Sequence, residues 1–143
     1  APAPGVNGRV LIGSAFGATS PVVHPSQPTL IALELDVGAR FDVPELADRG
    51  VYVVGGRVAI GDTELARDQL AVVRGDACVV AREASRVMIL GGAPLGHRFI
   101  DWNFVSSSQE AIDRARAGWK AQTFPKIPGD DQEFIPLPEF PRH

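Results

Sequence analysis

Short apolar blocks separated by glycine-containing turns dominate the centre of the sequence, residues 50–92. The blocks are rich in Val and Ile and are interrupted by Gly-Gly, Gly-Asp and Arg-Gly-Asp, which are turn signals. No apolar period of helical length occurs there, so this run predicts consecutive antiparallel strands with the close, even spacing of a β-sandwich or barrel. The predicted strands are 51–54, 57–60, 63–65, 69–73, 77–82 and 86–90.

The segment before this run predicts two more strands. Residues 29–36, TLIALELD, alternate along the chain and end at Gly38, which is typical of a half-buried strand. Residues 9–13 predict a short strand. The Pro- and Gly-rich residues 1–8 predict a loosely held arm, and the prolines of residues 14–28 predict a surface loop.

One helix is predicted after the aromatic, extended run RFIDWNFV of residues 98–105. Ser107 and Glu110 have the spacing of a capping box, in which each side chain satisfies an otherwise unpaired N–H group. The helix has an apolar stripe at Ile112, Ala115 and Trp119. We expect this stripe to lie against the sheet with Trp119 as its anchor.

The C-terminal segment, residues 124–141, is too rich in proline to form regular structure. Its side chains Phe134, Ile135 and Leu137 are too apolar for a free tail, so we expect it to wrap a surface of its own domain or of a neighbour. Trp102 and Trp119 could form a ligand platform, but their spacing favours packing.

These elements divide the chain into four parts of a single domain. The parts are an arm with the first strand and loop (1–28), a β-barrel core (29–106), a C-terminal helix (107–121) and a Pro-rich wrapping tail (122–143).

Composition narrows the function classes. The chain has 143 residues, 45% of them hydrophobic, and a formal net charge of -3, so one globular domain without disulfides is expected. Its scattered Lys and Arg argue against nucleic-acid binding, and no run is long enough to span a bilayer. The single cysteine, Cys78, indicates a reducing compartment, which predicts a cytoplasmic protein. Cys78 could be a reactive thiol, but its apolar strand favours a small buried side chain.

Two sets of polar residues could be ligands. His24 lies beside a proline with no second His near it in the sequence, so a structural role is favoured over metal binding. Three carboxylates, Asp42, Glu45 and Asp48, invite a metal or acid–base hypothesis. Without a partner His, a solvated acidic loop is the favoured interpretation.

The last third of the sequence carries a specific set of motifs. These are Gly-Gly-Ala-Pro-Leu at 91–95, Trp-Asn-Phe-Val-Ser-Ser at 102–107, a helix that closes on Trp119, and Pro-Gly-Asp-Asp-Gln-Glu-Phe-Ile-Pro-Leu-Pro at 128–138. In these motifs the chain resembles the carboxyl-terminal domain of bacterial pirin-like proteins. The resemblance implies a cupin fold, a double-stranded β-helix or jelly-roll barrel, and an amino-terminal partner cupin that this sequence, which starts without Met, does not include.

The resemblance also implies where metal chemistry belongs. In pirins, iron is expected in the amino-terminal cupin on three His and one Glu, and some bacterial members oxidise flavonols such as quercetin. The two general cupin metal-binding strings, counted here from Gly38 and Gly61, retain none of these ligands. The first string places its ligands at Pro44, Leu46 and Arg49 or Gly50. The second has Arg67, Gln69, Val72 and Asp76 at its marked positions. We therefore expect no metal, cofactor or catalytic residue in this chain, because such side chains do not supply the converging donors iron needs.

Three functional hypotheses follow. The first is a non-catalytic, metal-free domain that supports the partner cupin and presents a surface to other proteins or to a second copy. Its candidate interaction residues are Trp102, Phe104, Phe134, Ile135 and Leu137. The second is the inert half of an iron-dependent quercetin 2,3-dioxygenase. The third is a free-standing cupin that binds a small apolar molecule in the barrel mouth.

Overall fold

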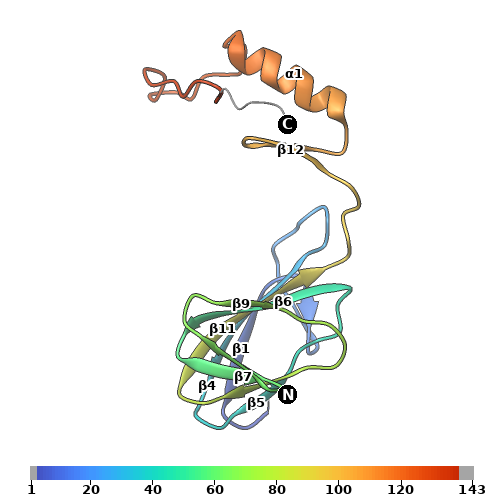
Figure 1. Cartoon of the computed structure of the whole chain (residues 1–143), viewed down its shortest axis with the longest axis vertical. Helices are drawn as coiled ribbons and strands as arrows, with labels where there is room; N and C mark the ends of the chain where they lie inside the picture. The colour runs from blue at the N-terminus through green and yellow to red at the C-terminus, as the bar shows by residue number, and fades with distance from the viewer. Residues whose placement is uncertain (1–2, 139–143) are drawn as a thin grey trace. The chain divides into compact units, whose positions relative to one another are not determined.

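The structure is a computed structural model that describes residues 3–138. Its contacts divide the chain into two compact units, Ala1–Pro94 and Leu95–His143, whose strands and helix are labelled in Figure 1. This division falls inside the range 29–106 that the sequence assigned to one barrel core. The ends of the predicted arm (1–2) and of the predicted tail (139–143) lie outside the described residues.

The first unit consists of two antiparallel sheets that enclose a common interior (Figure 1). The five-stranded sheet has the order β1 (Val6–Ile12), β4 (Thr29–Leu35), β11 (Ser85–Gly92), β6 (Asp48–Gly55) and β9 (Leu70–Val72). The four-stranded sheet has the order β5 (Arg40–Asp42), β10 (Cys78–Ala81), β7 (Arg57–Ile60) and β8 (Thr63–Ala66). A small hairpin, β2 (Ser14–Ala15) and β3 (Ala18–Thr19), follows β1.

The core lies between the inner faces of the two sheets. Strand β4 alternates as the sequence predicts, with Ile31, Leu33 and Leu35 buried and Glu34 exposed. Opposite them on β11, Val87 and Ile89 are fully buried, and Phe41 and Val79 contribute from the other sheet. Burial of these branched side chains is the main stabilising term of the barrel, and the all-β prediction for this part of the chain is confirmed.

The predicted strands of the central run are present with shifts of at most three residues at their ends, but one connection was misjudged. The turn at Gly61 joins the paired strands β7 and β8. Gly55-Gly56 instead carries the chain from β6 in one sheet to β7 in the other. Gly56 has φ 80°, and a Cβ there would lie 2.5 Å from the Ala84 carbonyl oxygen, so glycine is needed for the crossing and not for a hairpin.

Three predicted irregular segments contain structure. Val6, which the sequence placed in a loose arm, is buried and begins β1 opposite Leu35. The predicted loop 14–28 includes the β2–β3 hairpin, and the predicted acidic loop includes β5. Period-two patterning is hard to detect in strands of two or three residues, which explains why β2, β3 and β5 were missed.

The second unit contains the hairpin β12 (Phe99–Asp101) and β13 (Phe104–Ser106), the helix α1 (Gln109–Lys120) and the C-terminal segment. The prediction of one extended run over 98–105 is wrong at Trp102, whose φ of 53° reverses the chain. The helix packs on this hairpin. It begins one residue later than predicted, because the Ser108 hydroxyl, and not that of Ser107, accepts the hydrogen bond from the Ala111 N–H group at 3.4 Å.

Candidate functional site

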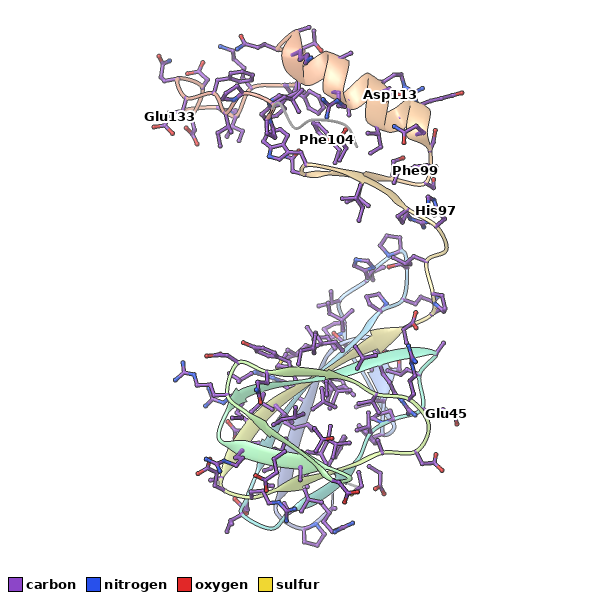
Figure 2. All side chains as sticks on the ribbon, viewed as in Figure 1. Glu45, His97, Phe99, Phe104, Asp113 and Glu133 are labelled. Atoms are coloured by element: carbon purple, nitrogen blue, oxygen red, sulfur yellow. The ribbon has the colours of Figure 1, made fainter. Side chains whose placement is uncertain are left out.

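The aromatic residues of the second unit form one cluster around Trp119. Its ring centroid lies 5.3 Å from that of Trp102 and 6.2 Å from that of Phe104, both with edge-on geometry. Phe124 and Phe134 complete the cluster, each with its ring centroid 5.6 Å from that of Trp119. Figure 2 labels Phe104 on the hairpin that faces α1. Such pairs stabilise beyond their buried area, so the cluster is the small core of this unit.

The C-terminal segment packs back on the helix. The Trp119 Nε1–H group donates a hydrogen bond of 2.8 Å to the Ile135 carbonyl, and Phe134 stacks on the same indole. A turn at Gly129, with Ile127 opposite Asp130, directs the chain toward this contact. Of the residues proposed as an interaction surface, Trp102, Phe104 and Leu137 are half-buried, whereas Phe134 and Ile135 are 45% and 68% exposed.

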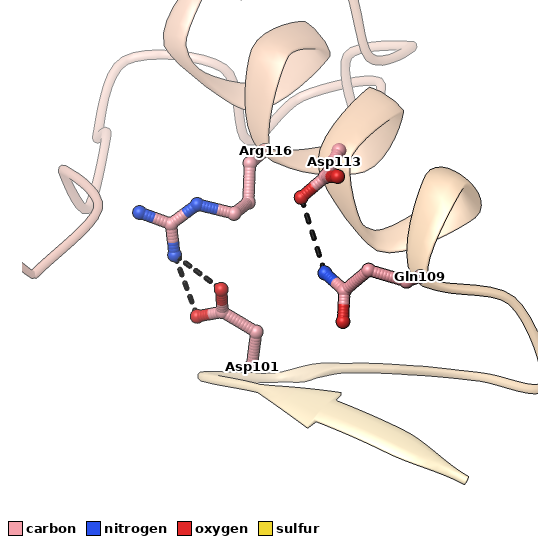
Figure 3. A network of polar contacts seen from close by, with 4 residues as sticks. All are labelled: Asp101, Gln109, Asp113 and Arg116. Carbon is pink, nitrogen blue, oxygen red and sulfur yellow. Dashed lines mark hydrogen bonds and ion pairs between the residues drawn. The ribbon is translucent and has the colours of Figure 1, made fainter. Parts of the chain in front are cut away.

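An ion pair connects the hairpin to the helix. One guanidinium nitrogen of Arg116 lies 2.6 Å from both carboxylate oxygens of Asp101 (Figure 3). Both side chains are less than one-third exposed, so this pair is screened less than a surface pair. Nearby on the helix, the Gln109 amide donates to Asp113 at 3.1 Å (Figure 3). The Arg116–Asp101 pair therefore holds one face of the hairpin on α1, whereas the Gln109–Asp113 contact lies within the helix.

The other face of the hairpin presents two apolar side chains that the sequence analysis overlooked. Ile100 and Val105 are directly opposite each other and are 72% and 62% exposed. They alternate with Phe99, Asp101 and Phe104, which point to the helix side. The alternation in RFIDWNFV was the available signal, but it required the turn at Trp102 to be recognised.

The outer face of the five-stranded sheet carries a larger apolar surface, which we call the sheet patch. It comprises Leu30, Tyr52, Leu70, Val72, Met88 and Leu90, on strands β4, β6, β9 and β11. Their registers are continuous across the sheet. In one row Met88 lies between Tyr52 and Ala32, with Leu70 beyond Tyr52. In the next row Leu90 lies between Gly50 and Leu30, with Val72 beyond Gly50.

The sheet patch is open to solvent along one side. Val72 and Leu70, on the edge strand β9, are 74% and 57% exposed, and Leu90 is 38% exposed. Contiguous apolar patches of this kind mark interaction surfaces more often than isolated apolar residues do. The sequence signal was present in VYVV, LAVV and VMIL, because strands that are apolar on both faces are typical of sheets covered on both sides.

Arg49 is, with Gly50, one of the two positions at which the pattern count places the cupin carboxylate ligand, and it has a structural role. Its side chain is buried, and its guanidinium donates to the carbonyls of Val43, Pro44 and Gly75, with the Pro44 contact at 2.7 Å. A cation fixed on three carbonyls at this position opposes the binding of a second cation there.

The remaining pattern positions do not converge on one point. Val72 lies on the sheet patch, Arg67 and Asp76 are exposed, and the Gln69 amide oxygen accepts from the Ala66 N–H at 2.8 Å. Within residues 3–138, no group of three or more His, Cys, Asp or Glu could hold a metal ion. The residues present therefore do not fit the iron site that the cupin pattern describes.

The other polar candidates have local environments. Cys78 is half-buried on β10, and burial together with the Asp42 carboxylate raises the pKa of its thiol; this environment opposes thiolate chemistry at neutral pH. A hydrogen bond of 2.9 Å joins the His24 Nδ1 atom to the Ser26 hydroxyl and closes a local turn. Glu45 is exposed at the outside of the barrel (Figure 2).

The two antiparallel sheets around an apolar interior place the first unit in the cupin class. A crystal structure of quercetin 2,3-dioxygenase from Acinetobacter baumannii superimposes with a TM-score of 0.84, covering 100% of this chain and 50% of that one at 22% identity. The protein GK1651 from Geobacillus kaustophilus matches with a TM-score of 0.56 over 65% of this chain and 42% of its own, at 23% identity. These similarities establish the fold.

The family follows from the sequence. The model of the pirin C-terminal cupin domain matches residues 30–125, and the chain belongs to this family. A pirin-like protein from Caulobacter vibrioides is 45% identical over 139 residues, which is 94% of this chain and 48% of the relative. The chain therefore spans about half the length of this relative, and the proposed pirin resemblance and cupin fold are confirmed. Among the described residues, no helix is long and apolar enough to cross a membrane.

Proposed function

We propose that this chain is a non-catalytic, metal-free cupin domain that docks on a metal-binding cupin through the sheet patch. The observation that carries the proposal is the continuous apolar surface on the outside of the five-stranded sheet, where Val72 and Leu70 are exposed. The proposed occupant is the other half of a pirin-like protein, because a relative of this family is about twice as long as this chain.

The chemistry of the pattern positions supports the non-catalytic part of the proposal. Arg49 binds backbone carbonyls, and Val72 has no donor atom. The second unit supplies an additional proposed contact through Ile100 and Val105, together with the tail residues Phe134, Ile135 and Leu137. In this proposal Trp102 and Phe104 do not contact the partner. They hold the hairpin and the tail in place through the aromatic cluster around Trp119.

The experiment is a binding measurement with a matched pair of variants. This chain is mixed with the half of the Caulobacter vibrioides relative that it does not cover, and complex formation is measured by sedimentation velocity. Val72→Lys places a charge in the sheet patch, whereas Val37→Lys makes the same change at an equally exposed valine, 71% against 74%, in the turn after β4. We expect Val72→Lys to weaken the complex about tenfold or more, since a charge desolvated at an interface core opposes binding.

Three outcomes would overturn the docking proposal. One is the absence of a complex, another is equal binding by the two variants, and the third is a homodimer through the same face. Because both valines are solvent-exposed, both variants should unfold within about 0.5 kcal/mol of the unmodified chain. A difference in affinity between the two variants then cannot be attributed to a difference in their stability.

The similarity to the Acinetobacter baumannii structure raises a second hypothesis about the intact protein. That protein is a quercetin 2,3-dioxygenase, and we propose that, if the intact protein oxidises a flavonol, the reaction occurs in the partner domain. Oxygen uptake with quercetin would then be found for the intact protein and not for this chain. Oxygen uptake by this chain alone would contradict the proposal that the reaction occurs in the partner domain.

A further inference from the structure

The sheet patch contains a gap, because one position in its rows is a glycine. Gly50 lies on β6 between Leu90 of β11 and Val72 of β9, on three neighbouring strands of the five-stranded sheet (Figure 1). Leu90 and Val72 each carry a branched side chain on the outer face, whereas Gly50 carries none. The outer face therefore has a hollow at this position, with the backbone of Gly50 as its floor.

This hollow, which we call the notch, has apolar walls and a volume of about 450 Å³. Leu70, Val72 and Leu90 line it around Gly50, and all three side chains are exposed. Leu70 leans over the floor, since a Cβ atom added at Gly50 would lie 3.2 Å from its Cδ1 atom. The volume is near the lower end of the range for small-molecule sites, about 300–1,000 Å³, so the notch has room for one large side chain.

One end of the notch is polar. The row beyond Gly50 contains Asp48, opposite Gly92, and Arg74 lines the same end of the notch. Asp48 and Arg74 are both exposed. Tyrosine and tryptophan have an apolar ring with one polar tip, and they are favoured where one end of a site is apolar and the other end reaches water. The notch therefore suits a ring of this kind, with the Asp48 carboxylate as a hydrogen-bond acceptor.

A notch in an apolar patch is the usual place for the strongest contact of an interface. Protein interfaces gain most of their binding energy from a few residues, above all Trp, Tyr and Arg, that fill well-packed pockets on the partner. Glycine weakens the interior of a strand, and it often marks a site where another molecule approaches the backbone closely. Gly50 is not among the glycines with positive φ, so its backbone conformation is open to other residues.

We propose that the notch binds one aromatic side chain, a tyrosine or a tryptophan, of the partner cupin. The inference rests on the proposed docking through the sheet patch and names the residue type that anchors it. The partner is the occupant because this chain covers only 48% of the Caulobacter vibrioides relative, which leaves about one further domain to be docked. The ring packs between Leu70, Val72 and Leu90. Its polar tip faces Asp48.

The test adds one methyl group to the floor of the notch. Gly50→Ala makes the sheet patch more apolar but fills part of the notch, so a flat apolar interface and an anchored one predict opposite changes. We expect the affinity for the half of the Caulobacter vibrioides relative that this chain does not cover to fall about tenfold, because an overfilled pocket excludes the anchor. A flat interface would bind Gly50→Ala as well as the unmodified chain, or better.

Gly55, at the end of the same strand, provides the matched control. A Cβ atom added there would have no atom within 4 Å, and Gly55 is not part of the sheet patch. Gly55→Ala should therefore bind like the unmodified chain. Urea unfolding checks that both variants are folded. In Gly50→Ala the new methyl group would lie 3.3 Å from the Ala71 carbonyl oxygen, a close contact that a small shift relieves.

A second measurement identifies the anchor in the unmodified complex and does not depend on the folding of a variant. Intermolecular nuclear Overhauser effects from the methyl groups of Leu70, Val72 and Leu90 should converge on one tyrosine or tryptophan ring of the partner. Replacement of that partner residue by alanine should weaken the complex. It should also reduce the effect of Gly50→Ala to less than about twofold, since both changes remove the same contact.

The outcomes separate this inference from the docking proposal. If the unmodified chain forms no complex, the docking proposal fails and the anchor fails with it. If the complex forms and Val72→Lys weakens it, three results overturn the anchor alone. These are equal affinities of Gly50→Ala and Gly55→Ala, methyl contacts that reach no tyrosine or tryptophan ring, and an undiminished effect of Gly50→Ala on the alanine variant of the partner.

Discussion

Arg49 is the residue whose replacement should most damage the barrel. It is 8% exposed and donates to carbonyls of two loops that are distant in sequence, at Val43 and Pro44 on one side and Gly75 on the other. Replacement by methionine keeps the apolar stem and removes the three donors. The substitution therefore tests the hydrogen bonds of the guanidinium separately from the packing of the side-chain stem.

The size of the effect follows from these contacts. A hydrogen bond from a charged group contributes about 1.5–3 kcal/mol, but the three share one side chain and the carbonyls regain some water, so the sum is below three independent bonds. We expect Arg49→Met to lower the free energy of unfolding by about 3 kcal/mol. For a unit of this size that corresponds to a fall of roughly 15 °C in Tm. Arg49→Lys should be intermediate, because an ammonium is a single point donor and cannot span both loops.

The assay is thermal and urea unfolding followed by circular dichroism, with Arg86→Met as the matched control. Arg86 lies on β11 and pairs with Glu34 at 3.8 Å, with both side chains 64% exposed, so its loss should change stability by less than about 0.5 kcal/mol. If Arg49→Met were as stable as Arg86→Met, the guanidinium would not hold the two loops and the structural role assigned to it would be refuted.

Three further predictions concern single contacts. Tyr52, the one tyrosine of the chain, donates a hydrogen bond of 3.1 Å to the Asp68 carboxylate, which raises the pKa of the phenol. Asp68→Asn should lower that pKa, which is measured from phenolate absorbance. An unchanged titration curve would contradict the contact. Arg116→Met should destabilise the second unit by about 1 kcal/mol in urea unfolding. Arg114→Met, which removes an exposed ion pair with Glu110 at 4.0 Å, should have almost no effect. Equal effects of the two variants would count against the ion pair between Arg116 and Asp101. Trp119→Phe removes the indole donor to Ile135 and should speed proteolysis of residues 124–138 several-fold; an unchanged cleavage rate would show that this hydrogen bond does not hold the segment.

The sequence predicted strands well where glycine turns separate Val- and Ile-rich blocks. Residues 57–60 and the turn at Gly61 were placed correctly, because β7 and β8 are neighbours in sequence and in space. It did not predict that β6 and β7 belong to different sheets. Alternation reports which side of a strand is buried but carries no information on which sheet the strand joins.

The candidate sites show the same limit. The apolar tail and the two tryptophans were identifiable, yet their mutual contact depended on the turn at Trp102, a residue that rarely adopts positive φ. The sheet patch is assembled from β4, β6, β9 and β11, which are not consecutive. Its members were visible as apolar runs, but only the register brings Leu70, Tyr52 and Met88 into one row.

The central claim is that this domain docks on a metal-binding cupin and binds no metal itself. The most direct test is the metal content of this chain and of the full-length Caulobacter vibrioides relative, each incubated with ferrous iron under anaerobic conditions, freed of excess iron and analysed by mass spectrometry. The account predicts about one iron in the full-length protein and none in this chain, because Val72, and Arg49 or Gly50, stand where the cupin pattern needs donors. One tightly held iron in this chain would contradict it.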